Sequence, residues 1–317
     1  MPRIAYLGPE GTFTEAALIR MASSGMVPGN GPSHDVTPVP TESTAAALAA
    51  VRADDADYAC VPIENSIEGS VLPTLDSLSV GPELQIFAEL TLDVAFTIVV
   101  RPGTTAGDVR TIAAFPVASA QVRQWLAANL PAAQLVPANS NAAAAKDVAE
   151  GRADAGVSTP LAADRYGLAA LASDVVDEPN ARTRFVLVGP PGPPPASTGA
   201  DRTSVVLRLD NVPGALVSAM TEFAIRDIDL TRIESRPTRR ELGTYIFFLD
   251  CVGHIEDDAV AEALKALHRR CADVRYLGSW PTGSATGAAP PQLDEASQWL
   301  MRMRDGKRPG TRGAEES

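Results

Sequence analysis

One proline- and glycine-rich stretch, GPPGPPPASTGADR at residues 189–202, restricts the fold of this chain more than any other feature. Proline lacks the N–H that a helix interior or a central strand needs, so neither element can run through this stretch. The chain on each side must therefore fold separately, joined by a semi-rigid linker. We predict a first domain at 1–189, a linker at 190–202, a second domain at 203–280 and a partly disordered C-terminal tail at 281–317.

The region before the linker alternates short apolar runs with helical patterns. Runs that predict strands occur at 4–7, 58–63, 84–92, 93–100 and 185–188. Such alternation predicts an α/β region with a parallel or mixed sheet. The two extended runs at 84–92 and 93–100 lead the chain out of a first group of strands and helices, to which it later returns. This path indicates two lobes with a cleft between them. We interpret 25–40 as a loop, because glycine and proline are frequent in it.

The pattern changes beyond the linker. Strands are predicted at 203–209, 228–235, 244–252 and 274–279, and helices at 215–226 and 257–270. This order, βαββαβ, is typical of the ferredoxin-like fold. One such module leaves strand edges unpaired, so we expect two modules to pair. We attribute Gly214 to a close approach of backbone segments, since glycine has no side chain.

Composition argues against several classes of function. A net charge of −12 disfavours general nucleic-acid binding, because the chain would repel phosphates. The three cysteines lie far apart, and no HExxH or G-x-S-x-G motif occurs, so we predict neither a metal site nor a cofactor, and no motif supports a serine triad. No apolar run is long enough for a membrane span or a signal peptide, and we therefore expect a cytoplasmic protein with no membrane role.

Polar residues stand at the ends of several predicted strands. The GPEGTF loop at 8–13 leads from a strand into a helix, whose free N–H groups could hold an anion, although it matches no nucleotide-binding motif. The residues ENS at 64–66 directly follow a buried strand, and NARTRF at 180–185 leads into another. Taken singly, each place could be an ordinary turn or strand edge. In α/β proteins, however, ligand contacts gather at such strand ends.

Five motifs resemble the prephenate dehydratase family, in its monofunctional, actinobacterial type. They are GPEGTFTEAA (8–17), VPIENSIEGSVLPTLD (61–76), NARTRFVLVG (180–189), VPGAL (212–216) and ESRP (234–237). The resemblance covers 2–279, and it implies a bilobed catalytic region shaped like a periplasmic binding protein, followed by an ACT domain that senses phenylalanine. One motif departs from the family. Where a serine, a histidine and a glutamine are often found, this chain has Ala114, Phe115 and Val117, although Gln121 is kept.

The resemblance also implies a reaction: prephenate loses its ring hydroxyl and carboxylate to give phenylpyruvate, water and carbon dioxide, with no cofactor. Thr183 would stand beside the leaving hydroxyl, backed by Glu64 or a water. Arg184 would anchor a substrate carboxylate. The substrate-binding residues so implied are Thr12, Phe13, Asn65, Ser66, Gln121, Ser158, Arg184 and Phe185.

An ACT domain implies an allosteric phenylalanine site between two modules. The residues expected there are Asn211, Val212, Pro213, Gly214, Ala215, Leu216, Glu234, Ser235, Arg236 and Pro237. Such an interface requires at least a homodimer, and a homotetramer stays open. Two other functions also stay open: dehydration of arogenate, the amino analogue of prephenate, and sensing of a metabolite without turnover. A sensor, however, would not need the hydroxyl of Thr183.

Overall fold

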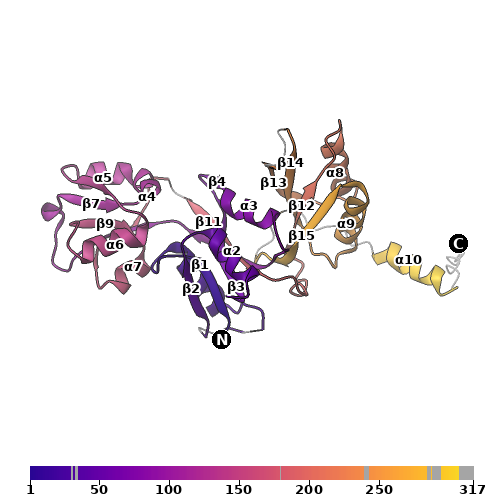
Figure 1. Cartoon of the computed structure of the whole chain (residues 1–317), viewed down its shortest axis with the longest axis horizontal. Coiled ribbons are helices and arrows are strands. Elements are labelled where there is room, and N and C mark those ends of the chain that lie inside the picture. The colour runs from indigo at the N-terminus through magenta and orange to yellow at the C-terminus, as the bar shows by residue number, and fades with distance from the viewer. Residues whose placement is uncertain are drawn as a thin grey trace, which may run out of the picture. The chain divides into compact units, whose positions relative to one another are not determined.

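The chain separates at the proline-rich stretch into two units, Met1–Pro193 and Pro194–Ser317 (Figure 1). The computed structural model describes residues 1–29, 31–32, 35–178, 180–238, 243–283, 287 and 294–306. Most of the tail expected at 281–317 lies outside these residues, so its predicted disorder stays a prediction.

The first lobe of the first unit is built on a mixed sheet ordered β2-β1-β3-β11-β5, with the short β4 paired to β3. Its strands are β1 (Arg3–Leu7), β2 (Thr37–Thr41), β3 (Tyr58–Asn65), β4 (Gly69–Ser70), β5 (Gln85–Asp93) and β11 (Arg182–Gly189). β1 is parallel to β2 and β3, whereas β11 is antiparallel to β3 and β5. The helices that pack on this sheet are α1 (Phe13–Ser23), α2 (Thr44–Arg52) and α3 (Leu72–Ser79).

The second lobe has a sheet of its own, ordered β10-β6-β9-β7-β8. Its strands are β6 (Phe96–Val100), β7 (Thr111–Ala114), β8 (Gln134–Pro137), β9 (Ala155–Ser158) and β10 (Ala169–Val175). Its helices are η1 (Ala106–Asp108), α4 (Pro116–Gln121), α5 (Arg123–Asn129), α6 (Asn141–Ala149) and α7 (Pro160–Arg165). The chain crosses between the lobes twice, from β5 to β6 and from β10 to β11. The predicted bilobed α/β architecture is therefore confirmed.

The second unit is a four-stranded antiparallel sheet ordered β13-β14-β12-β15. Its elements are β12 (Asp201–Arg208), α8 (Ala215–Ala224), β13 (Leu230–Pro237), β14 (Tyr245–Val252), α9 (Asp258–Arg270), β15 (Asp273–Pro281) and α10 (Asp294–Arg304). From β12 to β15 the order is βαββαβ, which confirms the predicted ferredoxin-like fold. Leu207 and Leu249 of the sheet pack against Phe223 and Leu267 of the helices to form the core.

Two local expectations were wrong. Residues 37–40 of the segment that we interpreted as loop belong to β2, where Pro38 and Pro40 are accommodated because β2 is an edge strand that pairs with β1. Gly214 does not mark a close approach, since a Cβ atom there would have no neighbour within 4 Å. Its φ of 82° lies in the left-handed region at the start of α8, so glycine is favoured for its conformation and not for its size.

The described part of the chain contains neither a helix that could span a membrane nor a cluster of metal-binding side chains. None of its helices combines the length and the apolar character needed to cross a bilayer. Within the same residues, histidine, cysteine and acidic side chains form no group of three or more that could hold a metal ion. Cys60 and Cys251 are buried, and burial raises the pKa of both thiols, that of Cys251 to about 12.

Asp154 is expected to make the second lobe sensitive to acid. Its Oδ2 accepts hydrogen bonds from the N–H groups of Arg110 and Thr111, each at 3.0 Å. These bonds, led by the one from Arg110, hold the pKa of Asp154 below its ordinary value. A lowered folded-state pKa means that the stabilisation is complete above the unfolded pKa and is lost as the pH falls through the folded value. Asp154→Asn should therefore lower the free energy of unfolding at about pH 7. The free energy of unfolding should also fall less between about pH 7 and about pH 3 in this variant than in the wild type.

Urea unfolding at both pH values would measure this effect. Asp174→Asn is a suitable control, because Asp174 is an exposed aspartate in β10 of the same lobe. Acid sensitivity that is the same in Asp154→Asn and in the wild type would contradict the prediction.

Candidate active site

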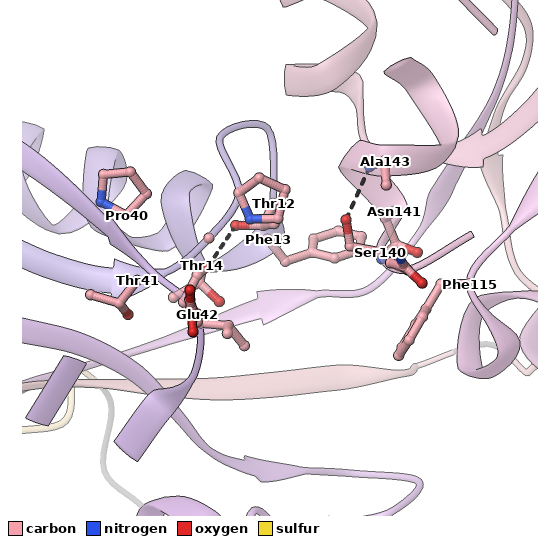
Figure 2. Close-up of a pocket in the computed structure, with 14 residues that line it drawn as sticks. Thr12, Phe13, Thr14, Pro40, Thr41, Glu42, Phe115, Ser140, Asn141 and Ala143 are labelled. Carbon is pink, nitrogen blue, oxygen red and sulfur yellow. Dashed lines mark hydrogen bonds between the residues drawn. The ribbon is translucent and has the colours of Figure 1, made fainter. Parts of the chain in front are cut away.

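A cavity of about 680 Å³ lies between the two lobes of the first unit (Figure 2). The first lobe lines it with the end of β1, the loop that follows, the start of α1 and the segment around the end of β2. The second lobe contributes the starts of α4 and α6. The lining residues are Leu7, Gly8, Pro9, Thr12, Phe13, Thr14, Pro40, Thr41, Glu42, Phe115, Asn139, Ser140, Asn141 and Ala143.

Two helix N-termini from opposite lobes face this cavity. Thr12 caps α1, and its Oγ1 accepts a hydrogen bond from the Glu15 N–H at 3.3 Å. Ser140 caps α6 in the same way, accepting from the Ala143 N–H at 3.0 Å, a bond drawn in Figure 2. The first N–H groups of a helix lack partners within the helix and carry a partial positive charge. The cavity is therefore suited to a ligand with two negative groups.

Aromatic side chains form the apolar part of the cavity. Phe13 packs edge-on against Phe96 at a ring-centroid distance of 5.7 Å and contacts the cores of both lobes. Phe115 lines the cavity from the second lobe, at the position where the family often has histidine. The Oδ1 atom of Asn141 is buried and has no hydrogen-bond partner among the described residues, so it can accept a hydrogen bond from a ligand or a water.

Sequence reasoning found only part of this lining. Thr12 and Phe13 were predicted, but the residues from β2 and α6 were not. In the sequence, the NSN segment at 139–141 predicts only a helix cap. The prolines of β2 argue against the strand that brings Thr41 and Glu42 to the cavity. A polar cap at the start of a helix in an α/β region was the one available signal for the α6 residues.

A second group of predicted residues meets where β3 and β11 pair. Asn65 lies opposite Thr183, and its Nδ2 donates a hydrogen bond to the Thr183 Oγ1 at 2.9 Å. The Oδ1 of Asn65 accepts from the N–H groups of Ile67 and Glu68, at 2.8 and 3.1 Å. These two bonds fix the orientation of the amide, so the Thr183 oxygen acts as an acceptor toward Asn65. The hydroxyl hydrogen of Thr183 is then available to donate to another group.

The residues around Asn65 and Thr183 lie at the same end of the sheet as the cavity. β1 and β3 are parallel, so Leu7 and Asn65, the last residues of these strands, lie at the same carboxyl-terminal end of the sheet. Leu7 lines the cavity, whereas Thr183, Glu64, Asn65 and Ser66 do not. Ser66 joins the two strands, because its Oγ accepts a hydrogen bond from the Arg182 N–H at 2.8 Å.

Asn65→Asp is expected to lower kcat about 100-fold with little change in KM, if the Thr183 hydroxyl serves the reaction. The aspartate keeps the acceptor that holds the Ile67 and Glu68 N–H groups but replaces the donor to Thr183 by a second acceptor, which would draw the hydroxyl hydrogen toward itself. Steady-state kinetics would test this. Asn129→Asp is a matched control, since the one hydrogen bond of the Asn129 amide among the described residues is to the Trp125 carbonyl in α5. Equal kinetics in both variants would refute the orientation argument.

Arg184 is engaged inside the first lobe. Its guanidinium contacts Glu64 of β3 at 2.9 Å and Glu89 of β5 at 3.1 Å, and the residue is 8% exposed. The expected role as an anchor for a substrate carboxylate is not supported by this placement, because two protein carboxylates already bind the guanidinium. Phe185 is 2% exposed and packs in the core of the first lobe, so it is a core residue and not a cleft residue.

Two predicted residues of the second lobe, Ser158 and Gln121, are buried away from the lining of the cavity at the atoms that could bind a ligand. Ser158 is completely buried, and its hydroxyl donates to the Asn141 carbonyl at 2.6 Å, which supports the start of α6. Gln121 ends α4, and its Oε1 is buried without a hydrogen-bond partner among the described residues. Neither side chain lines the cavity.

A smaller cavity of about 160 Å³ lies in the second unit, between the loop after β12 and the start of β14. Of the expected allosteric residues, Asn211, Val212, Ala215 and Leu216 line it, whereas Pro213 and Gly214 do not. Glu234, Ser235, Arg236 and Pro237 lie instead on the edge strand β13, where Ser235 and Pro237 pair with the cavity residues Phe247 and Tyr245.

Two family profiles match this chain. The profile described as prephenate dehydratase matches residues 4–192, and the profile described as ACT domain matches residues 203–269. A curated prephenate dehydratase of Mycobacterium sp. (strain JLS) is 78% identical over 308 residues, which cover 96% of this chain and 97% of that relative.

Solved structures agree with these matches. A prephenate dehydratase from Arthrobacter aurescens, determined in complex with L-Phe, has a TM-score of 0.84 at 41% identity and covers 96% of this chain and 100% of that chain. A protein described as a novel type of quorum quenching acylase has a TM-score of 0.77 at 30% identity, covering 88% of this chain and 97% of its own. Because the first profile spans more than half of the sequence and the curated relative matches nearly all of it, the chain belongs to the prephenate dehydratase family.

Proposed function

We propose that the chain is a prephenate dehydratase, a carbon–oxygen lyase that converts prephenate into phenylpyruvate, water and carbon dioxide. The observation that carries this proposal is the convergence of two helix N-termini, from α1 and α6, on one cavity. Prephenate bears two carboxylates, and each N-terminus can hold one of them with backbone N–H groups. The similarity to curated dehydratases supports the same assignment.

The reaction consumes one proton and transfers no electrons to an acceptor. The bond between the ring and its carboxylate breaks, the electron pair enters the ring, and the hydroxyl at the opposite ring carbon leaves as water after taking up the proton. Aromatisation drives the process, so the protein needs to bind the dianion, assist the leaving hydroxyl and exclude water. No bond to the protein has to form.

Thr183 is our candidate for the donor to the leaving hydroxyl. A threonine hydroxyl is a weak acid, so we assign it a positioned hydrogen bond and not complete proton transfer. The hydrogen bond from Asn65 supports this assignment, because it leaves the hydroxyl hydrogen of Thr183 to donate. Glu64, which is 41% exposed at its side chain and pairs with Arg184, is our candidate for the group that supports Thr183, directly or through water. The aromatic side chains Phe13 and Phe115 would contact the ring.

Feedback control is assigned to the second unit. We propose that phenylalanine binds near the cavity formed by Asn211, Leu216 and Tyr245, and that binding across two ACT modules of a homodimer or homotetramer lowers activity. The complex of the Arthrobacter relative with L-Phe supports this ligand. Coupling of this kind has a typical free energy of about 1–3 kcal/mol, which corresponds to roughly 5- to 150-fold in affinity.

Two alternative functions have weaker support. Arogenate differs from prephenate at one substituent, and its carboxylates and ring could be held by the same groups. A sensor without turnover would use the helix N-termini but would have no use for a threonine hydroxyl oriented by Asn65. We therefore favour catalysis over sensing, and prephenate over arogenate because the similar curated relatives are named prephenate dehydratase.

The test is phenylpyruvate formation by the purified chain from prephenate, with and without phenylalanine. Turnover that phenylalanine suppresses would support both the catalytic and the regulatory assignment. Turnover that phenylalanine leaves unchanged would remove the regulatory one. An absence of turnover with folded protein would contradict the proposal, and the same assay with arogenate would then separate the two alternatives.

A further inference from the structure

The loop between β1 and α1 is attached to the second lobe by a residue that does not line the cavity. Arg165 is the last residue of α7, and its guanidinium contacts two carboxylates of the first lobe. It donates to the Glu15 Oε1 at 2.8 Å and also binds the exposed Glu10. At the other end of α7, the Thr159 hydroxyl donates to the Gly11 carbonyl at 2.6 Å. Both ends of α7 therefore hold the same loop.

Glu15 transmits this contact to the backbone of the loop. Its side chain is 4% exposed, and its second oxygen, Oε2, accepts a hydrogen bond from the Gly11 N–H. The chain of contacts runs from Arg165 through Glu15 to Gly11, which directly precedes Thr12 and Phe13 of the cavity lining. A carboxylate that is buried in this way requires a charged partner, and the only salt bridge that the described residues provide for Glu15 is with Arg165.

The packing at Gly11 shows how closely the lobes meet. A Cβ atom added to Gly11 would lie 2.9 Å from the Ala162 Cβ of α7, and Gly11 has a φ of +87°. The loop therefore lies directly against α7, with no space for a side chain between them. By contrast, the ion pairs of Arg152 with Asp147 and Glu150 stay within the second lobe.

We propose that Arg165 is a positioning residue that latches the two lobes together and thereby fixes the α1 N-terminus at the cavity. The inference rests on the proposed function in one respect, namely that this cavity binds the substrate. Without the latch, the lobes separate more readily and the helix N-terminus that holds one carboxylate loses its fixed position. The protein then binds the substrate and the transition state more weakly, and by the same factor. KM therefore rises while kcat changes little.

The experiment compares Arg165→Gln, Arg165→Lys and the control Arg152→Gln in the full-length protein. We expect Arg165→Gln to raise KM for prephenate about tenfold or more with kcat within about threefold, and Arg165→Lys to recover part of the loss. Arg152→Gln, which removes an arginine paired with two carboxylates of its own lobe, should leave KM unchanged. A purely structural role would lower stability without this separation of KM from kcat.

Hydrogen exchange of the amides at 10–14 provides a readout that does not depend on turnover. We expect exchange there to be about tenfold faster in Arg165→Gln than in the wild type or in Arg152→Gln. If the wild type does not act on prephenate, the proposed function fails. The hydrogen-exchange rates at 10–14 then test by themselves whether Arg165 holds the two lobes together. Wild-type exchange and wild-type KM in Arg165→Gln would overturn the proposal. If that variant does not fold, the double variant Glu15→Gln/Arg165→Gln, which leaves no buried charge unpaired, takes its place with the same expected results.

Discussion

Thr183→Ala is expected to lower kcat for prephenate by about 100-fold or more, with KM close to that of the wild type. The hydroxyl oxygen of Thr183 accepts from the Asn65 amide at 2.9 Å, so its hydrogen is directed away from Asn65 and can assist the departing hydroxyl. Alanine removes this donor without filling or emptying the core, because Thr183 is only half-buried at the start of β11. Initial rates of phenylpyruvate formation would measure the effect.

Two further variants make this prediction sharper. Thr183→Ser keeps the hydroxyl and should retain most of the activity. If Asn65 acts through Thr183, the double variant Asn65→Asp/Thr183→Ala should be no slower than Thr183→Ala alone, because residues that act as a unit are not additive. Turnover near that of the wild type in Thr183→Ala would remove Thr183 from the mechanism.

Arg184→Ala is expected to destabilise the first unit by about 3–5 kcal/mol, because it removes the guanidinium that neutralises the buried carboxylate of Glu89. Glu89 is 9% exposed, and the arginine connects it to Glu64 across β11. Arg182 on the same strand is the matched control. It pairs with Asp93 where both side chains are mostly exposed, so Arg182→Ala should cost no more than about 1 kcal/mol.

Urea unfolding of the full-length variants would measure both values. A stability of Arg184→Ala near that of the wild type, together with a large increase in KM for prephenate, would contradict the structural role. That result would restore the assignment of Arg184 as an anchor for a substrate carboxylate, since only a ligand contact would then depend on its charge.

Much of the fold could be predicted because the relevant signals are local. The proline-rich stretch interrupts secondary structure wherever it stands, and the alternation of strands and helices on each side follows from the spacing of apolar residues. A strand that was missed, β2, carries Pro38 and Pro40, which locally argue for a loop. Only its position at the sheet edge, beside β1, makes these prolines acceptable.

The site was less predictable, because its contacts join residues that are distant in the sequence. Asn65 and Thr183 are 118 positions apart, and only the pairing of β3 with β11 shows that their side chains form a hydrogen bond. Thr12 could be recognised from its loop and helix cap. Asn141 could not, because a polar residue at the start of a helix is common and its exposure to a cavity depends on the opposite lobe.

The sequence by itself determined the division of the chain, both fold classes, the family and the segments that carry polar groups at strand ends. The tertiary structure decided which of those groups face a ligand. Arg184 and Phe185 follow Thr183 directly, yet one is held by two carboxylates and the other is in the core. The reason is physical: the side-chain surroundings of a residue depend on neighbouring strands and on the opposite lobe, which local sequence does not specify.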